Sequence, residues 1–440
     1  MGTNGLLKAI LNRRQALIIV ALMNALYAFS YFQRVAIPGT IFDELQSDLH
    51  LSSASVALLG GIFLYAYGAM QIFSGALVDR FGPAMVILSG GVLLSVGSIL
   101  FPLSGNISML YSVRLLVGIG GSIMFLAIVK ELDLRFSDKN FSALLSASLL
   151  AGYAGGLLGT RPFEIVVRTF DWRPALLIIG FACAVTVVLA AVSMRKSLAP
   201  GGCRSGASTL PALKRIFRNC SAYPVILSST IVFGNYFLMQ AIIGKKVLED
   251  CCGLTSGAAA SATFMMMLAS MGAAVFSGFF SRLIGNRRKP ILITSTIMSV
   301  LAPCLGIMVL NGASHLIIPC YILFGISAGG SPIFTSSMKE LNEPEYVGTS
   351  VGLLNGIVYL SIAGFVTLSG LVLDRFASHA VVTTTAIRYP AEAYQAIMYV
   401  CLGLAIVAFI SGLLIRETSG VNVWTADKVQ NIAEDFSVAG

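Results

Sequence analysis

The segment from Pro83 to Ser104 reads PAMVILSGGVLLSVGSILFPLS and contains no charged residue. A helix of about 20 apolar residues spans the hydrocarbon core of a lipid bilayer. Similar segments recur along the whole chain of 440 residues, of which 56% are hydrophobic and 11% are charged. Soluble globular domains have about 25% charged residues. The sequence therefore predicts an all-α polytopic membrane protein whose main solvent is lipid.

Twelve transmembrane segments of this kind are predicted, joined by mostly short connections. They are 15–37, 54–78, 83–104, 107–129, 142–163, 174–194, 222–243, 258–281, 290–310, 316–337, 348–372 and 394–415. A long basic connection that includes Pro200-Gly201-Gly202 interrupts the series after the sixth segment. We therefore predict four parts, which are a six-helix bundle in 1–194, a cytoplasmic linker in 195–221, a second six-helix bundle in 222–415 and a cytoplasmic tail in 416–440.

The distribution of basic residues predicts the orientation of the spans. With both termini in the cytoplasm, the inner segments hold 20 of the 29 lysines and arginines, and an excess of basic residues marks cytoplasmic loops. The net charge of +9 is thereby explained without a nucleic-acid partner. Because the loops are short, we expect an integral protein of the bacterial inner membrane, and we expect it to be a monomer.

The two predicted bundles share short motifs in the same order. Leu51-Ser52-Ser53 matches Leu254-Thr255-Ser256 and Ser74-Gly75 matches Ser277-Gly278, both at a separation of 203 positions. Lys130-Glu131-Leu132 matches Lys339-Glu340-Leu341 and Ala154-Gly155 matches Ala363-Gly364, both at a separation of 209 positions. The chain is therefore predicted to contain two six-helix repeats. Parallel repeats of this kind enclose a substrate site at their interface, near the middle of the bilayer.

A polar turn between the second and third spans resembles a motif of the major facilitator superfamily. It reads Gly75-Ala-Leu-Val-Asp79-Arg80-Phe81-Gly82 and is similar to the G-x-x-x-D-R-x-G loop of that family. The stretch from Arg114 to Gly120 resembles the R-x-x-x-G-x-G signature, and the stretch from Gly278 to Gly285 resembles the second copy of the loop. The resemblance covers nearly the whole chain. It implies twelve transmembrane helices in two six-helix repeats.

The motif residues are predicted to act in a conformational switch. An Asp at a helix end beside an Arg can latch neighbouring helices through charge-assisted hydrogen bonds, although an ordinary polar turn is the alternative interpretation. The pairs at the end of the fourth span and at its repeat partner are interpreted as cytoplasmic gate residues. The predicted switch residues are Gly75, Asp79, Arg80, Gly82, Arg114, Lys130, Glu131, Lys339 and Glu340.

One basic residue, Arg34, interrupts the end of the first apolar segment. Asn24, Tyr27, Tyr31 and Arg34 are spaced three, four and three positions apart, so they share one helical face. The stretch resembles the region where organic-anion and phosphate-ester transporters of the superfamily hold an anion-binding Arg. The planar guanidinium suits a carboxylate or phosphate because it can donate two parallel hydrogen bonds. The alternative is that Arg34 extends to the outer membrane interface, as basic residues near helix ends do.

The second repeat supplies further candidates for substrate binding, which are Tyr236, Gln240, Asn355 and Tyr359. No second Arg lies opposite Arg34, since the position 203 residues further on is Phe237. This absence favours a monoanionic carboxylate over a dianionic phosphate ester. Lys245 and Lys246 lie near the predicted outer mouth, where they either attract anions or are solvated loop charges.

The sequence contains no recognisable catalytic constellation. Its three histidines and eight cysteines show no metal-binding spacing, and no phosphate-binding loop is present, so we expect no enzyme activity, metal or cofactor. The prediction is a secondary transporter of a small organic anion, by symport with a proton or sodium ion or by exchange. A multidrug or metabolite exporter with an apolar cavity is one alternative. A membrane receptor that binds but does not transport is the other.

Overall fold

The computed structural model describes residues 3–136, 138–195, 209–383 and 386–424. The first six spans of the predicted series correspond to helices α1 (Thr3–Ala36), α3 (Ser53–Phe81), α4 (Pro83–Leu103), α5 (Ile107–Ser122) continued by α6 (Met124–Arg135), α7 (Asp138–Leu158) and α9 (Trp172–Met194). Two short helices, α2 (Phe42–Leu49) and α8 (Arg161–Phe170), cap one end of this half.

The second half repeats this pattern. Its helices are α11 (Tyr223–Leu238) continued by η3 (Met239–Ile243) and α12 (Gly244–Cys251), α13 (Ser256–Leu283), α14 (Lys289–Leu310), α15 (Ile317–Ala328) continued by α16 (Ser331–Leu341), α17 (Val347–Arg375) and α18 (Ala391–Leu413). Helix α10 (Thr209–Arg218) precedes them, and a two-stranded hairpin, β1 (Val381–Val382) and β2 (Ile387–Arg388), lies before α18. Short 3₁₀ turns occupy Cys220–Ala222, Ser314–Leu316, Pro344–Tyr346 and Ala377–His379.

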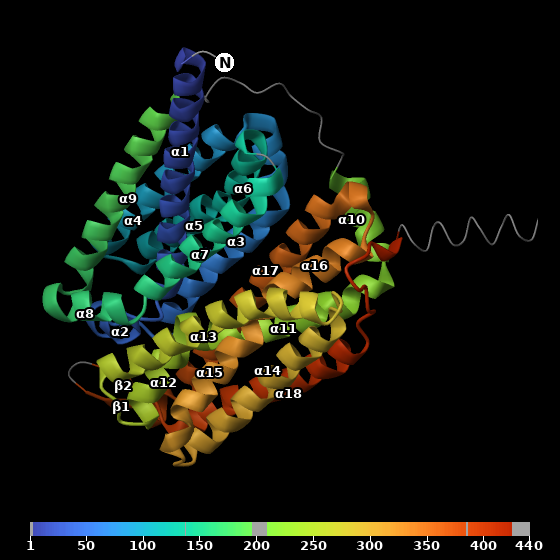
Figure 1. Cartoon of the computed structure of the whole chain (residues 1–440). Coiled ribbons are helices and arrows are strands. Elements are labelled where there is room, and N and C mark those ends of the chain that lie inside the picture. The colour runs from blue at the N-terminus through green and yellow to red at the C-terminus, as the bar shows by residue number, and fades with distance from the viewer. Residues whose placement is uncertain (1–2, 137, 196–208, 384–385, 425–440) are drawn as a thin grey trace, which may run out of the picture.

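The predicted twelve-helix membrane architecture is confirmed. Among the described residues, 11 helical segments are long and apolar enough to cross a membrane, and α7 stands in the place of the fifth predicted span. Figure 1 shows the blue-to-green helices of the first half beside the yellow-to-red helices of the second half. Residues 196–208 of the predicted linker and 425–440 of the predicted tail lie outside the described residues.

Several predicted span boundaries differ from the helix ends in the structure. The span predicted at 142–163 ends earlier, because α7 stops at Leu158 and α8 begins with Arg161 and Pro162 after a short turn. The span predicted at 222–243 continues further, because η3 is a five-residue π-helical turn that leads directly into α12. Lys245 and Lys246 therefore lie on a helix rather than in a loop.

The sequence repeat has a structural basis at helix ends. Ser52 is the N-cap of α3 and its side chain accepts a hydrogen bond from the amide of Ser55 at 3.2 Å. Thr255 is the N-cap of α13 and accepts from the amide of Ala258 at 3.3 Å. Each cap satisfies an amide that the helix leaves without an intrahelical partner. The matched sequences therefore start the equivalent helix of each half in the same way.

Glycines allow helices of the two halves to approach closely. A Cβ atom on Gly68 of α3 would lie 2.9 Å from the backbone nitrogen of Leu360 in α17. Gly356 of α17 faces the same contact, since a Cβ there would lie 3.2 Å from the carbonyl oxygen of Gly68. Small residues at such crossings permit the close backbone packing that stabilises helix pairs in lipid. The backbones of α3 and α17 are therefore in close contact at this crossing.

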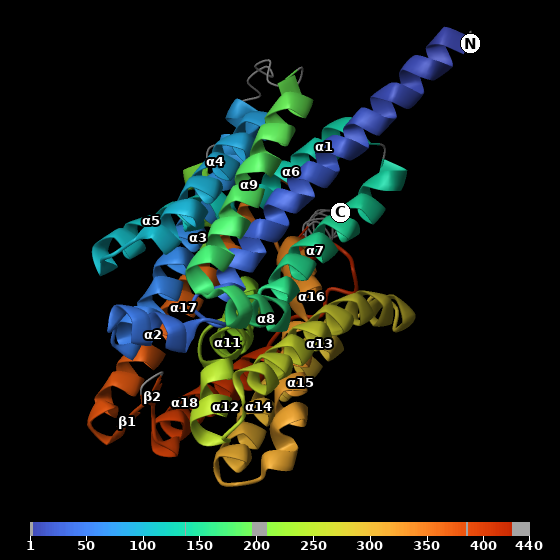
Figure 2. The same cartoon turned by 90° about the vertical axis from the view of Figure 1, so that its left-hand side faces the viewer.

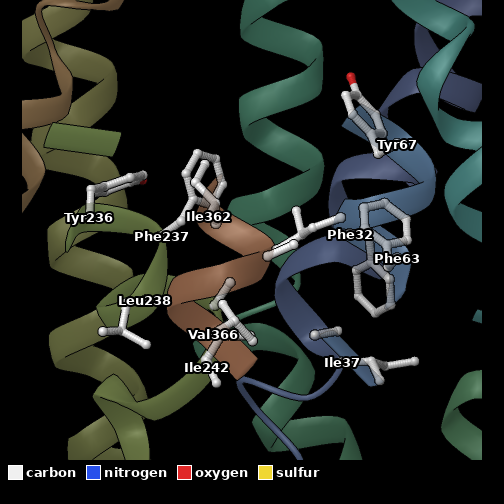
Figure 3. Close-up of a cluster of buried hydrophobic side chains, with 14 of the residues drawn as sticks. Phe32, Ile37, Phe63, Tyr67, Tyr236, Phe237, Leu238, Ile242, Ile362 and Val366 are labelled. Carbon is white, nitrogen blue, oxygen red and sulfur yellow. The ribbon is translucent and has the colours of Figure 1, made fainter. Parts of the chain in front are cut away.

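The two halves meet at one predicted outer end, which carries α2, α8, α12 and the β1–β2 hairpin (Figure 2). Close to this end, apolar side chains from α1, α3, η3 and α17 interleave between the halves (Figure 3). Phe63, Leu238, Ile242 and Ile362 in this cluster are almost completely buried. The candidate site adjoins this cluster, since Phe63 and Phe237 belong to both.

Candidate functional site

Arg34 is buried near the end of α1, inside a cage of aromatic rings. The residue is 2% exposed. The guanidinium carbon lies 4.3 Å from the ring centre of Tyr31, 4.5 Å from that of Tyr67 and 5.0 Å from that of Tyr359. Phe63 and Phe237 complete the cage at 5.9 and 5.8 Å. The faces of these rings attract a cation, which stabilises the charge without a carboxylate.

The guanidinium of Arg34 keeps two of its nitrogen atoms without an acceptor. Nη1 donates a hydrogen bond to the hydroxyl of Tyr359 at 2.9 Å. Nε and Nη2 are buried and have no hydrogen-bond partner among the described residues. Buried polar groups are normally satisfied, and an unsatisfied donor in a charged group is costly. These two nitrogen atoms are the pair that a carboxylate engages in a bidentate contact.

A cavity of about 570 Å³, including the open space at its mouth, adjoins this cage. Tyr31 and Tyr359 line the cavity and also contact Arg34, so the guanidinium lies directly behind the cavity wall. The other lining residues are Tyr153, Ser229, Phe233, Tyr236, Phe237, Ser270, Ala328, Ser331, Phe334, Thr335, Leu354, Asn355 and Val358. Four of the predicted binding residues, Tyr31, Tyr236, Asn355 and Tyr359, therefore lie together at one cavity.

The other predicted binding residues lie off the cavity wall. The ring of Tyr27 is buried and packs edge-on against Tyr31, with ring centres 5.1 Å apart. Asn24 lies one turn further along α1, and its Oδ1 is buried without a hydrogen-bond partner among the described residues. Gln240 lies in η3, where its amide is 3.5 Å from the sulfur of Met267. Tyr27 supports the cage, whereas Gln240 faces a neighbouring helix.

Sequence reasoning missed several cavity residues. Tyr153 of α7 lines the cavity and packs edge-on against Tyr31 at 5.8 Å. It lies among the glycines of α7, where a bulky polar ring between small residues is a usable signal. Phe233 and Phe334 are indistinguishable by sequence from other apolar residues of their helices, and only the packing of α11 against α16 brings them to the wall.

A second cluster of buried charges joins the halves at the predicted outer end. We call it the paired cluster, and it consists of Asp43 and Glu44 of α2 with Lys245, Lys246, Glu249 and Asp250 of α12. Lys246 is 1% exposed and lies 2.5 Å from Asp43 and 3.3 Å from Asp250. Lys245 is 3% exposed, donates to the carbonyl of Thr40 at 2.7 Å and lies 3.5 Å from Glu249.

The paired cluster corrects one interpretation of the two lysines. Solvated loop charges were one of the two expectations, but both side chains are buried on α12 and bound to carboxylates. The contacts between Lys246 and Asp43, and between Lys245 and Glu44 at 3.9 Å, cross from one half to the other. These ion pairs hold the halves together at this end.

Arg114 is buried as deeply as Arg34 but is differently satisfied. Its three nitrogen atoms donate to the backbone carbonyls of Leu59 at 3.1 Å, Gln33 at 3.2 Å and Ile37 at 3.0 Å. These acceptors lie on α3, on α1 and directly after α1. Arg114 therefore braces helices within the first half.

The predicted switch motif forms a tight turn between α3 and α4. Gly82 has a φ of +80°, which favours glycine, and Gly285 at the equivalent turn of the second half has a φ of +74°. Arg80 is exposed, and its guanidinium carbon lies 5.2 Å from the ring centre of Phe81. The side chain of Asp79 lies outside what the structure describes. Gly75 has open space beside it.

The predicted gate glutamates pair within their own halves. Glu131 forms an ion pair with Arg135 one turn later on α6, and its neighbour Lys130 is half-buried. Glu340 binds Arg288, whose Nη2 lies 2.8 Å away, and its neighbour Lys339 is exposed. Each glutamate therefore pairs with an arginine of its own half and holds a helix end in place.

Comparison with known proteins identifies the family. A family model described as the Major Facilitator Superfamily matches residues 23–367. The chain belongs to the major facilitator superfamily. This superfamily consists of transporters and not of enzymes, as the sequence predicts.

Relatives of this transporter carry different solutes. It is 32% identical over 162 residues to the uncharacterized transporter YybO of Bacillus subtilis, and this match spans 37% of each chain. It is 24% identical to the multidrug resistance protein D of Escherichia coli over 77% of this chain and 84% of that protein. It is 24% identical to human monocarboxylate transporter 11 over 76% of this chain and 68% of that protein.

The fold of the transporter matches solved structures at low sequence identity. A bacterial homolog of the human lysosomal transporter Spinster, in an inward-facing and unoccupied conformation, superposes with a TM-score of 0.74. The identity is 14%, and the match covers 91% of this chain and 98% of that chain. The similarity shows the fold alone.

Proposed function

We propose that this transporter moves an organic anion, a carboxylate, across the membrane by alternating access, as symport with a cation or as anion exchange. One observation carries the proposal. Nε and Nη2 of the buried Arg34 guanidinium have no acceptor in the described part of the chain, and Tyr31 and Tyr359, whose rings contact this guanidinium, line the cavity. A carboxylate supplies two acceptors and one compensating negative charge, so its binding removes the cost of both unsatisfied donors.

The surroundings of Arg34 favour one negative charge over two. The cavity lining contains no Lys, Arg or His, and Phe237 occupies the position where a second Arg would face the ligand. A dianion would therefore bring one uncompensated charge into an apolar site, which is expensive. The relationship to a monocarboxylate transporter over most of the chain supports the same conclusion.

The proposal includes an arrangement in the membrane. The four-part division at 1–194, 195–221, 222–415 and 416–440 would give two bundles that rock about the Arg34 site. Both termini would lie in the cytoplasm of a bacterial cell, with the protein as a monomer in the inner membrane. The paired cluster would then close the outer side of the cavity, and the turn from Gly75 to Gly82 would bias the change of state.

A transport assay on the purified protein in proteoliposomes tests the function. Wild type, Arg34→Gln and Arg34→Lys are compared for uptake of radiolabelled monocarboxylates, with Arg375→Gln as a matched control, because Arg375 is an exposed arginine at the end of α17. We expect uptake to fall by roughly 100-fold or more in Arg34→Gln and to recover only in part in Arg34→Lys, which cannot donate a planar fork. Unchanged uptake in Arg34→Gln would refute the proposed role.

An exporter of neutral or cationic drugs is the second candidate. The relationship to a multidrug resistance protein over 77% of this chain favours it, as does the aromatic lining of the cavity. The same variants separate the two candidates. A drug exporter should retain its activity when Arg34 is replaced by Gln. A buried cation repels cationic substrates and contributes little binding free energy to neutral ones.

A further inference from the structure

The cavity beside Arg34 has many aromatic rings in its wall. Seven of its fifteen lining residues are Tyr or Phe, and none of the fifteen is charged. The rings pack against one another in pairs. Tyr236 and Phe237 lie 5.2 Å apart at an interplanar angle of 75°, and Phe233 and Phe334 lie 6.3 Å apart at 67°. Edge-to-face packing of this kind leaves ring faces and edges available to a further aromatic group.

The charge and the three phenylalanines of the aromatic wall come from different halves of the molecule. Arg34 and Tyr31 belong to α1, whereas α11 and α16 supply Phe233 and Phe334. A ligand that satisfies both surfaces must therefore have an anionic end and an apolar body. The division also explains how one ligand could be held by both halves during the change of state.

The lining of the cavity indicates what body a ligand of Arg34 would have. Tyr31, Phe237 and Tyr359, whose rings contact the guanidinium of Arg34, line the same cavity as Phe233 and Phe334. A two-carbon acid bound to Arg34 would leave most of the aromatic wall without contact. The burial of apolar surface that drives binding of a ligand to such a wall would then be absent.

We propose that the substrates are bulky monocarboxylates with an aromatic body, whose carboxylate binds Arg34 and whose ring packs against Phe233, Phe237 and Phe334. This inference rests on the proposed function and narrows its substrate class. Asn355 makes no hydrogen bond within the described part of the chain and lines the same cavity. It lies one helical turn from Tyr359 on α17, where its amide is free to bind a polar substituent on the body of the ligand.

Ligand-induced thermal stabilisation of the full-length protein in detergent tests the inference. The probes are 3-phenylpropionate and phenylacetate as aromatic monocarboxylates, acetate and succinate as small acids, and 2-phenylethanol as a neutral aromatic compound. A ligand that binds the native state raises the apparent melting temperature according to its affinity. We expect the aromatic acids to act at concentrations roughly 10- to 100-fold lower than acetate or succinate, because a buried ring contributes a corresponding free energy.

Two variants separate the contributions of charge and ring. Arg34→Gln should weaken all the acids while leaving 2-phenylethanol unchanged. Phe334→Leu should weaken the aromatic acids and reduce their advantage over acetate, without changing the response to acetate itself. Circular dichroism and the melting temperature without ligand show whether each variant is folded, and Phe233→Leu provides a second test should Phe334→Leu not fold.

The outcomes distinguish the substrate class from the function. Acetate or succinate binding as tightly as 3-phenylpropionate, with a dependence on Arg34, would overturn the aromatic class but leave the anion transporter intact. Binding of 3-phenylpropionate that is unaffected by Arg34→Gln, or equalled by 2-phenylethanol, would overturn the proposed function as well. The absence of stabilisation by either aromatic acid overturns the inference.

Discussion

Two buried cationic sites lie between the halves of this transporter, and they differ in what satisfies them. Lys246 has carboxylates from both halves within 3.3 Å, together with the carbonyl of Ile387 at 2.7 Å. Arg34 has one hydroxyl and a set of aromatic rings, and two of its nitrogen atoms have no acceptor among the described residues. Both residues are almost completely buried, so burial alone does not distinguish them.

The difference indicates two separate roles for buried cations in this protein. A buried cation whose partners are all protein groups stabilises the contact between those groups, because separating them breaks every ion pair at once. A cation that keeps unsatisfied donors is poised for a partner from outside. We therefore assign closure of the predicted outer end to Lys246 and ligand binding to Arg34, and the following experiments test that division.

The largest expected effect is a loss of stability in Lys246→Met. The change leaves Asp250, whose side chain is 0% exposed, as a buried carboxylate without its ammonium partner. Removing one member of a buried pair typically costs about 3–5 kcal/mol, so the melting temperature in detergent should fall clearly. The double variant Lys246→Met with Asp250→Asn should recover part of the loss. A melting temperature equal to wild type would show that the pair does not hold this end.

The opposite result is expected for Arg34→Met, although Arg34 is just as deeply buried. Replacing a poorly satisfied buried charge by an apolar side chain is often neutral or stabilising by about 1–4 kcal/mol. The melting temperature should therefore stay constant or rise while anion uptake is lost. A strongly destabilised Arg34→Met variant would place Arg34 in the same structural class as Lys246 and would remove the contrast.

A smaller effect is expected for Tyr359→Phe, which removes the hydrogen bond between α17 and Arg34 of α1. Hydrogen bonds to charged groups contribute about 1.5–3 kcal/mol, so the closed outer end should open roughly tenfold more often. The labelling rate of Cys251 by a maleimide, followed by mass spectrometry, reports this opening, because Cys251 is half-buried at that end beside Tyr389. Equal rates in Tyr359→Phe and wild type would mean that the bond does not restrain the halves.

The smallest expected effect is a pH dependence from Glu44 at the edge of the paired cluster. Burial raises the pKa of the Glu44 carboxyl above its ordinary value of 4.5, against the opposing influence of Lys245. The folded state therefore binds this proton more tightly than the unfolded state. Its contribution to stability is complete below pH 4.5 and is lost as the pH rises through the raised pKa. Glu44→Gln should flatten the corresponding part of a melting temperature–pH curve, whereas an unchanged curve would exclude Glu44.

Much of the fold and the centre of the site could be predicted because lipid imposes simple rules. Apolar runs of the right length located the helices, and the spacing of Tyr27, Tyr31 and Arg34 located one face of α1. The approach of Tyr359 to Arg34 could not be derived from periodicity, because it depends on how α17 packs across the seam between the halves.

The error over Lys245 and Lys246 has a physical cause. Basic residues after an apolar run usually mark the edge of the membrane, where water solvates them. Here the acidic partners lie on α2, some two hundred positions away in sequence, and on the next turn of α12 itself. Pairing across the halves allows the helix to continue with its charges buried. The sequence contains Asp43 and Asp250, but nothing local in it indicates that they meet.

The π-helical turn η3 separates the two regions compared above, since α11 lines the cavity and α12 carries the lysines. Its repeat partner α1 runs without interruption from Thr3 to Ala36. A widened turn replaces the regular hydrogen-bond ladder and bends more readily than the α-helix on either side. The seventh membrane-spanning helix therefore has a hinge point that the first lacks. The outer segment α12 can therefore move with the paired cluster while α11 keeps its aromatic rings at the cavity wall.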